Sequence, residues 1–588
     1  MKPYTGYEQQ PDTTITIDHG SVPVHVHGYE HEHEVGRDSY VRRIDYSNLL
    51  LIFAGWAAVQ LVLPPAHEYP VIDDWIYART VQVMHLTGQF FTHPMTQANL
   101  FGLTVWGTLW TKVFGFSFTT LTYSTLVLAL AGLLAFYGIG RAVGVPPAGA
   151  LLGTALFGFN PITLHLSYTF MTDVPFMSLV LVSCYLYIRG LQRGDAAWLL
   201  AGGFVAAWAY TIRQFGLLVP VAFVLYVAFD RLLRGGWPCL WRGRNQMLAI
   251  AVVPAVVMVA WWLWRHGIPP TGAEAMAASR RDRFLFKEPW LRVFLLRSFI
   301  YLPITALSAW AAVRVPRSRW WLVLLLGTGV IWGMYAVELP NELWVQMYEP
   351  PFTVQLGPVA VTFPQAAFTF GGIGNIVRVG GIDFFEYHQQ PVLSTQVWRG
   401  LWALGVGLGI LLLASMAGSL YDWLRSIRRG GGLSPKVAFY LLGAMTFVVS
   451  AALLGDVYDR YMFHFLPFVI LYVVSGSVRW SRAAWAYSLA ALMLIASFSL
   501  LAKADHIDHA AARWQAAQWV YARTAGLRAG YDWDNWVGSR NDAYQIADVP
   551  LDGYRVDRRF PYFSRLGGFT TRYVLAQSRL DVPPLPSP

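Results

Sequence analysis

The sequence has 588 residues, of which 55% are hydrophobic and only 13% are charged. Soluble domains carry roughly 25% charged residues, so this composition excludes a soluble protein that covers its surface with charge. The formal net charge of +10 does not indicate nucleic acid as a partner, because the arginines lie mainly in short loops between long apolar runs, as topology determinants of membrane proteins do.

The N-terminal segment is polar and contains several histidines between His19 and His33. Short His-rich tracts without a folded scaffold are usually disordered. We therefore expect residues 1–46 to form a disordered cytoplasmic tail. No apolar stretch in this segment is typical of a removable signal peptide, so we expect the first span itself to direct insertion.

Apolar runs long enough to cross a hydrocarbon core of about 30 Å recur along most of the chain. They predict an all-α polytopic membrane domain over residues 47–502 with about thirteen transmembrane helices. The predicted spans cover residues 48–63, 119–140, 146–164, 174–190, 197–212, 215–230, 247–264, 293–313, 320–337, 401–424, 437–454, 462–478 and 484–502.

The distribution of arginine predicts which loops lie outside. With a cytoplasmic N-terminus, every loop predicted inside contains arginine, as the positive-inside rule requires. The outside then receives loops 64–118, 265–292 and 338–398 and the tail 503–588. The tail begins with a helical pattern and becomes rich in glycine and aspartate, so we expect a small external C-terminal domain of mixed structure. Because the longest loops are external, we expect the chemistry on the outer face.

One predicted outer loop breaks the charge rule. It contains Arg280, Arg281 and Arg283, with further basic residues on either side. A positive cluster on the unfavourable side of the membrane indicates an anionic ligand, either a phosphate or a lipid head group.

The first outer loop contains adjacent carboxylates at Asp73 and Asp74, followed by an apolar pattern that predicts an amphipathic helix at the membrane surface. Helix capping needs only one carboxylate. Two adjacent carboxylates beside a cleft can supply a general base, because burial and like-charge repulsion raise a carboxylate pKa.

A third carboxylate, Asp173, stands at the external end of the fourth span, two residues before Pro175. This position is also typical of a helix N-terminus. Because Asp173 is predicted at the same depth and on the same face as Asp73 and Asp74, the three carboxylates together favour a catalytic site over three separate caps.

Two arginines, Arg213 and Arg460, are predicted at the same external face. Each alone could extend to the lipid head groups. Together with the basic outer loop they predict a clamp for a phosphate, whose oxygens a guanidinium binds in pairs. Carboxylates beside such a clamp indicate chemistry with a phosphate leaving group.

The order and spacing of these motifs resemble the GT-C glycosyltransferases, and most closely the protein O-mannosyltransferases and the aminoarabinose transferases of lipid A. The resemblance covers roughly residues 48–480. The motifs that carry it are Asp73-Asp74 with Tyr77-Ala78, the stretch 101–115, Asn160-Pro161, Asp173-Val174-Pro175, Arg213-Gln214, and Asp459-Arg460-Tyr461 with Pro467. Residues 96–100 depart from the Lys-Pro-Pro stretch of the lipid A transferases.

The resemblance implies a GT-C fold with outer juxtamembrane helices. It also implies an enzyme of the bacterial inner membrane that transfers a hexosyl or pentosyl group, with inversion, from a polyprenyl-phosphate donor to a glycan, lipid or protein acceptor outside. The general base would be Asp73. Asp74 and Asp173 would position the acceptor or share the site, and Arg213 with the basic loop would hold the lipid phosphate.

Two other classes remain as alternatives. A secondary transporter or lipid-linked sugar flippase also has many spans, but coupled transporters usually place ionisable residues near the bilayer middle, where the predicted spans contain almost none. A structural subunit without catalysis is the third reading. The carboxylates also offer the oxygen ligands that Mg²⁺ or Mn²⁺ prefers, so a divalent cation stays an open alternative.

Overall fold

The computed structural model describes residues 29–71, 74–91, 96, 98–266, 319–335, 352–356, 359–363, 395–428, 433–453, 459–524, 527–528, 539–540, 543–547, 550, 553–565 and 569–585. The chain divides into two units, residues 1–48 and residues 49–588. The predicted disordered tail lies mostly outside the described residues, and all contacts given below are within the second unit.

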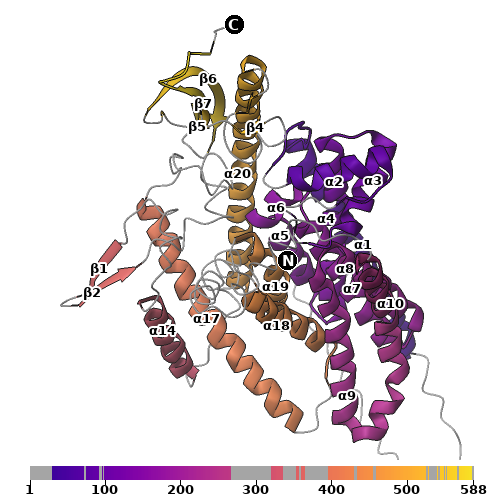
Figure 1. Cartoon of the computed structure of the whole chain (residues 1–588). Helices are drawn as coiled ribbons and strands as arrows, with labels where there is room; N and C mark the ends of the chain where they lie inside the picture. Colours follow the sequence, from indigo (N-terminus) through magenta and orange to yellow (C-terminus); the bar gives the residue numbers. More distant parts are fainter. Residues whose placement is uncertain are drawn as a thin grey trace, which may run out of the picture. The chain divides into compact units, whose positions relative to one another are not determined.

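Helices make up most of the described chain (Figure 1). In the first half they are α1 (Tyr29–Val62), α2 (Asp74–Thr87), α3 (Phe101–Phe114), α4 (Phe118–Ala142), α5 (Pro147–Gly158), α6 (Pro161–Ser167), α7 (Asp173–Arg193), α8 (Ala196–Ile212), the 3-10 helix η1 (Gln214–Leu217), α9 (Leu218–Arg242) and α10 (Arg244–His266). In the second half they are α14 (Trp320–Tyr335), α17 (Thr395–Arg428), α18 (Lys436–Leu453), η4 (Asp459–Phe465), α19 (Leu466–Ser475), η5 (Ser477–Arg479) and α20 (Arg482–Arg523).

Among the described residues, 8 helices are long and apolar enough to cross a membrane, or 9 if the bent pair α5 and α6 counts as one span. Shorter apolar helices occupy the predicted spans at 197–212, 320–337 and 437–454. The predicted span 293–313 lies outside the described residues. The protein is therefore a helical, multi-pass membrane protein, and the count of about thirteen spans stays a prediction.

The predicted span 146–164 is not one straight helix. The chain bends by 62° between α5 and α6, at Asn160 and Pro161. Pro161 has no N–H to continue the hydrogen bonding of α5, and the Asn160 side chain instead accepts a hydrogen bond of 3.0 Å from the N–H of Ile162. The Asn-Pro pair thus ends one helix and starts another inside the membrane domain.

Two short helices occupy the predicted outer loop 64–118. α2 and α3 lie against each other (Figure 1), and the hydroxyl groups of Thr80 and Thr104 are 3.2 Å apart between them. α3 also packs on α8, where the indole N–H of Trp208 donates to the carbonyl of Gly102 at 3.3 Å. α2 and α3 therefore form part of the same packed core as the spans.

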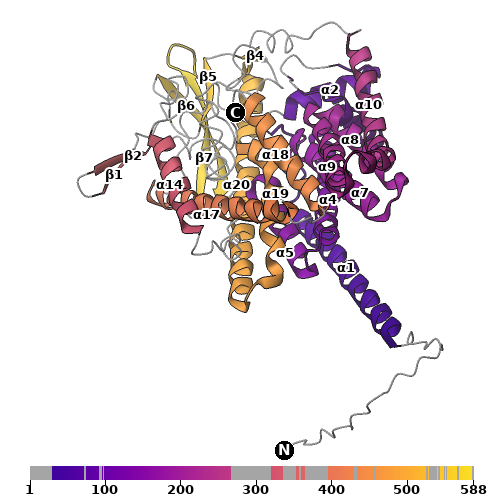
Figure 2. The same ribbon diagram turned by 90° about the horizontal axis from the view of Figure 1, so that it is seen from below.

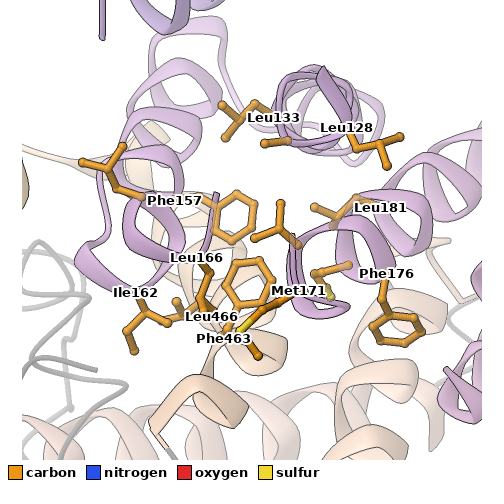
Figure 3. Packing of buried hydrophobic residues seen from close by; sticks show 14 of the residues in the cluster. Leu128, Leu133, Phe157, Ile162, Leu166, Met171, Phe176, Leu181, Phe463 and Leu466 are labelled. Atoms are coloured by element: carbon orange, nitrogen blue, oxygen red, sulfur yellow. The ribbon is translucent and has the colours of Figure 1, made fainter. Parts of the chain in front are cut away.

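The core of the membrane domain is formed by α4, α7 and α8 together with α5, α6 and α19. Figure 3 shows apolar side chains from α4, α5, α6, α7, α19 and η4 in this core, among them Phe157 of α5 and Phe463 of η4, whose rings stack with centroids 5.7 Å apart. α4 and α7 approach closely, because a Cβ atom added at Gly132 would lie 2.6 Å from the hydroxyl of Ser178. A side chain at residue 132 would push these two helices apart.

The predicted domain boundary at residue 503 falls inside α20, which runs unbroken for 42 residues. Its apolar pattern ends near that point, but nothing in the sequence stops the helix before Arg523. The strands that follow are β3 (Leu527–Arg528), β4 (Ser539–Arg540), β5 (Tyr544–Ala547), β6 (Tyr554–Ser564) and β7 (Thr570–Arg579). Of these, β5, β7 and β6 form an antiparallel sheet in that order.

This sheet lies beside the C-terminal half of α20 (Figure 2). The rings of His509 and Tyr562 are 5.0 Å apart, and those of Trp519 and Phe560 are 6.1 Å apart. Elsewhere, β1 (Phe352–Leu356) and β2 (Val359–Phe363) pair as an antiparallel hairpin within the predicted outer loop 338–398.

Candidate active site

The structure describes the side chains of three predicted site residues, Asp74, Asp173 and Arg213. The other predicted residues, Asp73, Arg280, Arg281 and Arg283, lie outside the described residues, and Arg460 lies in η4 with its side chain outside the described part. The described part of the site therefore consists of the carboxylates at the start of α2 and of α7 and their neighbours.

Asp173 is in the first turn of α7 and is completely buried. Its Oδ1 lies 3.0 Å from Nη2 of Arg213, and the Nε–H of Arg213 donates to the hydroxyl of Thr172 at 2.7 Å. Arg213 follows the last residue of α8, where the backbone has turned to an extended conformation. The guanidinium thus lies across the start of α7, and Asp173 is more than a helix cap.

A histidine completes this group. Nε2 of His464, in η4, is 3.4 Å from Nη1 of Arg213 and 3.8 Å from Oδ1 of Asp173. The imidazole also packs against the ring of Phe176, with centroids 5.6 Å apart. Sequence reasoning missed His464, although it lies four residues after Arg460 in a segment that the family resemblance had already marked.

The segment before α3 is fixed to the end of α8, next to Arg213. The Asn99 amide donates to the carbonyl of Tyr210 at 2.7 Å, and the N–H of Leu100 donates to the carbonyl of Ile212 at 3.0 Å. Leu100 has a φ of 63°, a left-handed backbone conformation that residues other than glycine rarely adopt. The segment before α3 is thereby held against the last turn of α8 at the cost of local backbone strain.

Asp74 is the first residue of α2 and is also completely buried. Its Oδ1 accepts a hydrogen bond of 2.7 Å from the N–H of Val71, and its own N–H donates to the carbonyl of Val71 at 3.2 Å. The carboxylate therefore fixes the turn that precedes α2, and the negative charge is favourable at a helix N-terminus.

A buried lysine from α20 lies within electrostatic reach of Asp74. Lys503 is 2% exposed, and its Nζ is 5.0 Å from the centroid of the Tyr168 ring. The Tyr168 hydroxyl donates to the carbonyl of Leu63 at 2.8 Å, which fixes the ring in place. Sequence reasoning placed Lys503 at the end of the last span and gave it no role.

Imidazoles surround this lysine. His67 has its Nδ1 2.8 Å from the carbonyl oxygen of Tyr69 and its Nε2 3.1 Å from the hydroxyl of Thr122. Burial and the nearby positive charge of Lys503 lower the pKa of His67 to about 4, so this imidazole is neutral at physiological pH.

Two further histidines, His165 of α6 and His506 of α20, are buried against each other with ring centroids 4.5 Å apart. Both imidazoles interact electrostatically with Lys503. The signal that would have found this cluster is the spacing of Lys503 and His506, three residues apart and so on the same side of a helix.

Residues 161–173 connect the group around Lys503 with the group of Asp173, Arg213 and His464. His165 belongs to the surroundings of Lys503, and Asp173 begins α7 at the other end of this stretch. In the described part of the chain, no group of three or more His, Cys, Asp and Glu side chains is arranged to hold a metal ion. Chemically, the two groups offer buried carboxylates beside cationic donors, an arrangement suited to proton transfer and phosphate binding.

Comparison with protein families gives one match. The profile described as "Dolichyl-phosphate-mannose-protein mannosyltransferase" matches residues 104–264, a stretch that includes Asp173 and Arg213. This match confirms the resemblance to protein O-mannosyltransferases over about a quarter of the chain. No sequence among the curated proteins matches the chain.

Several solved membrane transferases have similar structures. ArnT from Cupriavidus metallidurans bound to undecaprenyl phosphate matches with a TM-score of 0.45 and 11% identity, over 92% of this chain and 99% of ArnT. The Saccharomyces cerevisiae protein O-mannosyltransferase Pmt1-Pmt2 complex bound to the sugar donor gives 0.34 and 14%, over 42% and 36%. The oligosaccharyltransferase AglB from Archaeoglobus fulgidus, in complex with an inhibitory peptide and a dolichol-phosphate, gives 0.40 and 13%, over 83% and 58%.

Proposed function

We propose that this protein transfers a sugar, with inversion at the anomeric carbon, from a polyprenyl-phosphate-linked donor to an acceptor on the outer face of a bacterial inner membrane. The observation that supports this most directly is the buried group of Asp173, Arg213 and His464, where α7, α8 and η4 meet. Two of these residues lie inside the stretch matched by the mannosyltransferase profile.

The acceptor hydroxyl is a poor nucleophile at neutral pH, so it needs a carboxylate to accept its proton as the bond to carbon forms. We assign this role to Asp73, which precedes the buried Asp74 at the start of α2. Asp74 and Asp173 then hold the acceptor and the site in place.

The leaving polyprenyl phosphate gains negative charge in the transition state, and preorganised donors in a poorly solvated site stabilise it there. Arginine has five N–H donors. The contacts of Arg213 with Thr172, Asp173 and His464 engage three of them, which leaves two for phosphate oxygens. The basic cluster Arg280, Arg281 and Arg283 and the side chain of Arg460 are assigned to the same phosphate.

The test is a transfer assay with the purified protein in proteoliposomes that contain a polyprenyl-phosphate sugar. Mass spectrometry of co-purifying lipids selects the donor. We expect acceptor-dependent release of free polyprenyl phosphate. Movement of the intact lipid-linked sugar across the bilayer without its consumption would instead establish that the protein is a flippase. If no donor is either consumed or moved, the protein is a structural subunit without catalysis.

A matched pair of variants localises the activity. Arg213→Gln removes the donors beside Asp173 and should lower both polyprenyl-phosphate binding and transfer. Arg141→Gln is the control, because Arg141 is in the last turn of α4 and its Nη1 donates to the carbonyl of Val145, away from the proposed site. Equal loss in both variants would contradict the assignment of Arg213 to the phosphate.

A further inference from the structure

Two buried histidines, His165 of α6 and His506 of α20, have no role in the proposed reaction. His165 is 3% exposed and His506 is 6% exposed, and their rings meet edge to face with centroids 4.5 Å apart. In the described part of the chain, both nitrogens of His165 and Nδ1 of His506 have no hydrogen-bond partner. Because an unpaired buried polar atom is unfavourable and rare in native proteins, these nitrogens indicate a ligand.

A third histidine shows the contrast with an imidazole that is satisfied within the protein. Nδ1 of His67 is 2.8 Å from the carbonyl oxygen of Tyr69, and its Nε2 is 3.1 Å from the hydroxyl of Thr122. Its segment is held against α20, because the Tyr69 hydroxyl donates to the carbonyl of Ile507 at 3.2 Å. His67 therefore has a structural role, whereas the nitrogens of His165 remain open to a ligand.

A second contact joins the end of α6 to α20 beside this pair. The Nζ of Lys503 lies 5.0 Å from the centroid of the Tyr168 ring. On α20, Lys503 precedes His506 by three residues, and Tyr168 likewise follows His165 by three residues. Residues three apart in a helix lie on the same side. An amine and an aromatic ring therefore flank the pair of imidazoles.

The chemistry of the pair favours a ligand that both donates and accepts hydrogen bonds. Two imidazoles in contact in a buried site do not both carry a positive charge, since burial and the like charge each disfavour it. At least one imidazole is therefore neutral and offers one N–H donor and one acceptor nitrogen. Phosphate oxygens only accept hydrogen bonds, whereas each hydroxyl of a sugar both donates and accepts.

The location of the pair fits the sugar of a lipid-linked donor, which lies between the phosphate and the acceptor during transfer. His165 precedes Asp173 by eight residues, and Asp173 contacts Arg213, the arginine assigned to the phosphate. On the other side, the residue after His506 accepts a hydrogen bond from the segment that leads into α2, where the proposed base lies. The pair is thus connected to both parts of the proposed site.

We propose that His165 and His506 bind hydroxyl groups of the sugar carried by the lipid donor. This inference rests on the proposed transferase function, which requires a lipid-linked sugar inside the membrane domain. A neutral imidazole that donates through one nitrogen and accepts through the other fixes the orientation of the sugar. The two histidines are therefore binding residues that distinguish a sugar-carrying lipid from the bare lipid phosphate.

The first test measures thermal stability without a ligand. His165→Phe keeps an aromatic ring against His506 but removes both unpaired nitrogens, so this variant should melt at or above the wild-type temperature. His67→Phe is the matched control and should melt lower, because it loses two hydrogen bonds. If the larger ring at residue 165 prevents folding, His506→Phe takes the same test.

One outcome of this first test would contradict the proposal. Melting temperatures of His165→Phe and His506→Phe that fall as far as that of His67→Phe would show that the nitrogens are satisfied in the ligand-free protein, by water or by another residue. The pair would then be part of the folded core and not a site for a sugar.

The second test compares lipids with and without a sugar. The full-length protein in nanodiscs is titrated with polyprenyl phosphate and with polyprenyl phosphates that carry mannose, glucose or arabinose. We expect the wild type to prefer a sugar lipid to the bare phosphate. In the double variant His165→Phe with His506→Phe, this preference should fall at least about fivefold, while affinity for the bare phosphate is unchanged. His165→Gln, which keeps a donor and an acceptor, should retain part of the preference.

Each other result of the titration decides against the sugar site. Equal weakening of all lipids in the double variant would assign the imidazoles to the phosphate. A preference that the double variant retains, or that the wild type lacks for all three sugars, would show that the imidazoles contact no sugar. A wild type that binds a sugar lipid through these histidines but transfers nothing would refute the proposed function and leave the sugar site in place.

Discussion

At the scale of single residues, the candidate site depends on a few buried charges. Asp74 and Asp173 are both completely buried, and each lies at the beginning of a helix. The sequence indicated these carboxylates because they are predicted at the same depth and on the same face of the membrane domain. It did not indicate His464 as a neighbour of Asp173, at 3.8 Å from Nε2 to Oδ1, because His464 comes from a segment almost 300 residues away in the chain.

The sharpest prediction at this scale concerns Asp73. Asp73→Asn keeps the size of the side chain but removes the proton acceptor, and general-base catalysis contributes about 10² to 10⁴-fold. We therefore expect single-turnover transfer to fall at least about 100-fold, or about 3 kcal/mol of transition-state stabilisation. The measurement uses a synthetic polyprenyl-phosphate sugar.

Asp74→Asn and Asp173→Asn are the matched variants, with thermal melting as the folding control. Both should retain more activity than Asp73→Asn, because we assign Asp74 and Asp173 to positioning and only Asp73 to proton transfer. Normal turnover in Asp73→Asn with an inactive Asp74→Asn would move the base to Asp74. Activity in all three variants would reduce the carboxylates to helix caps.

At the scale of elements, apolar runs located the helices well and their irregularities poorly. α4, α7, α8 and α10 lie where the apolar runs predict them, because a membrane span must be apolar over its whole length. The break at Asn160 and Pro161 interrupts one apolar run without a change in hydropathy. In α20 the apolar run ends near Lys503, but the helix continues beyond it to Arg523.

The basic outer loop carries the prediction at this scale. Arg280, Arg281 and Arg283 are predicted to lie on the side of the membrane that the positive-inside rule disfavours, and we assign them to the lipid phosphate. Replacing all three with Gln should weaken binding of polyprenyl phosphate at least about tenfold, since each charged contact contributes about 1 kcal/mol or more. Binding is measured by titration into nanodiscs.

The control for this loop is Arg425 with Arg428 and Arg429, a basic cluster at the end of α17 that is predicted to face the cytoplasm. Gln at these three positions should leave polyprenyl-phosphate affinity unchanged. An unaltered affinity in the outer-loop variant as well would mean that the loop contacts only the head groups of bulk lipids.

At the scale of the whole molecule, the predicted topology follows from the arginine pattern and from the predicted odd number of spans. We predict that the N-terminus is cytoplasmic and that the chain after α20 is outside. Reporter fusions of alkaline phosphatase and green fluorescent protein after Gly431 and after Pro588 should report opposite sides of the membrane. The same side for both positions would contradict the predicted arrangement of spans.

α20 also fixes the position of the C-terminal sheet along the helix axis, because the sheet packs on the second half of this unbroken helix through His509 and Trp519. A helix of 42 residues is about 63 Å long at a rise of 1.5 Å per residue, roughly twice the thickness of a hydrocarbon core. A flexible linker would let the sheet occupy many positions. A straight helix instead fixes both the position of the sheet along the helix axis and its orientation around that axis. Because each residue turns a helix by about 100°, deleting a single residue beyond Lys503 would rotate the sheet away from the face it now presents, with hardly any change in its height.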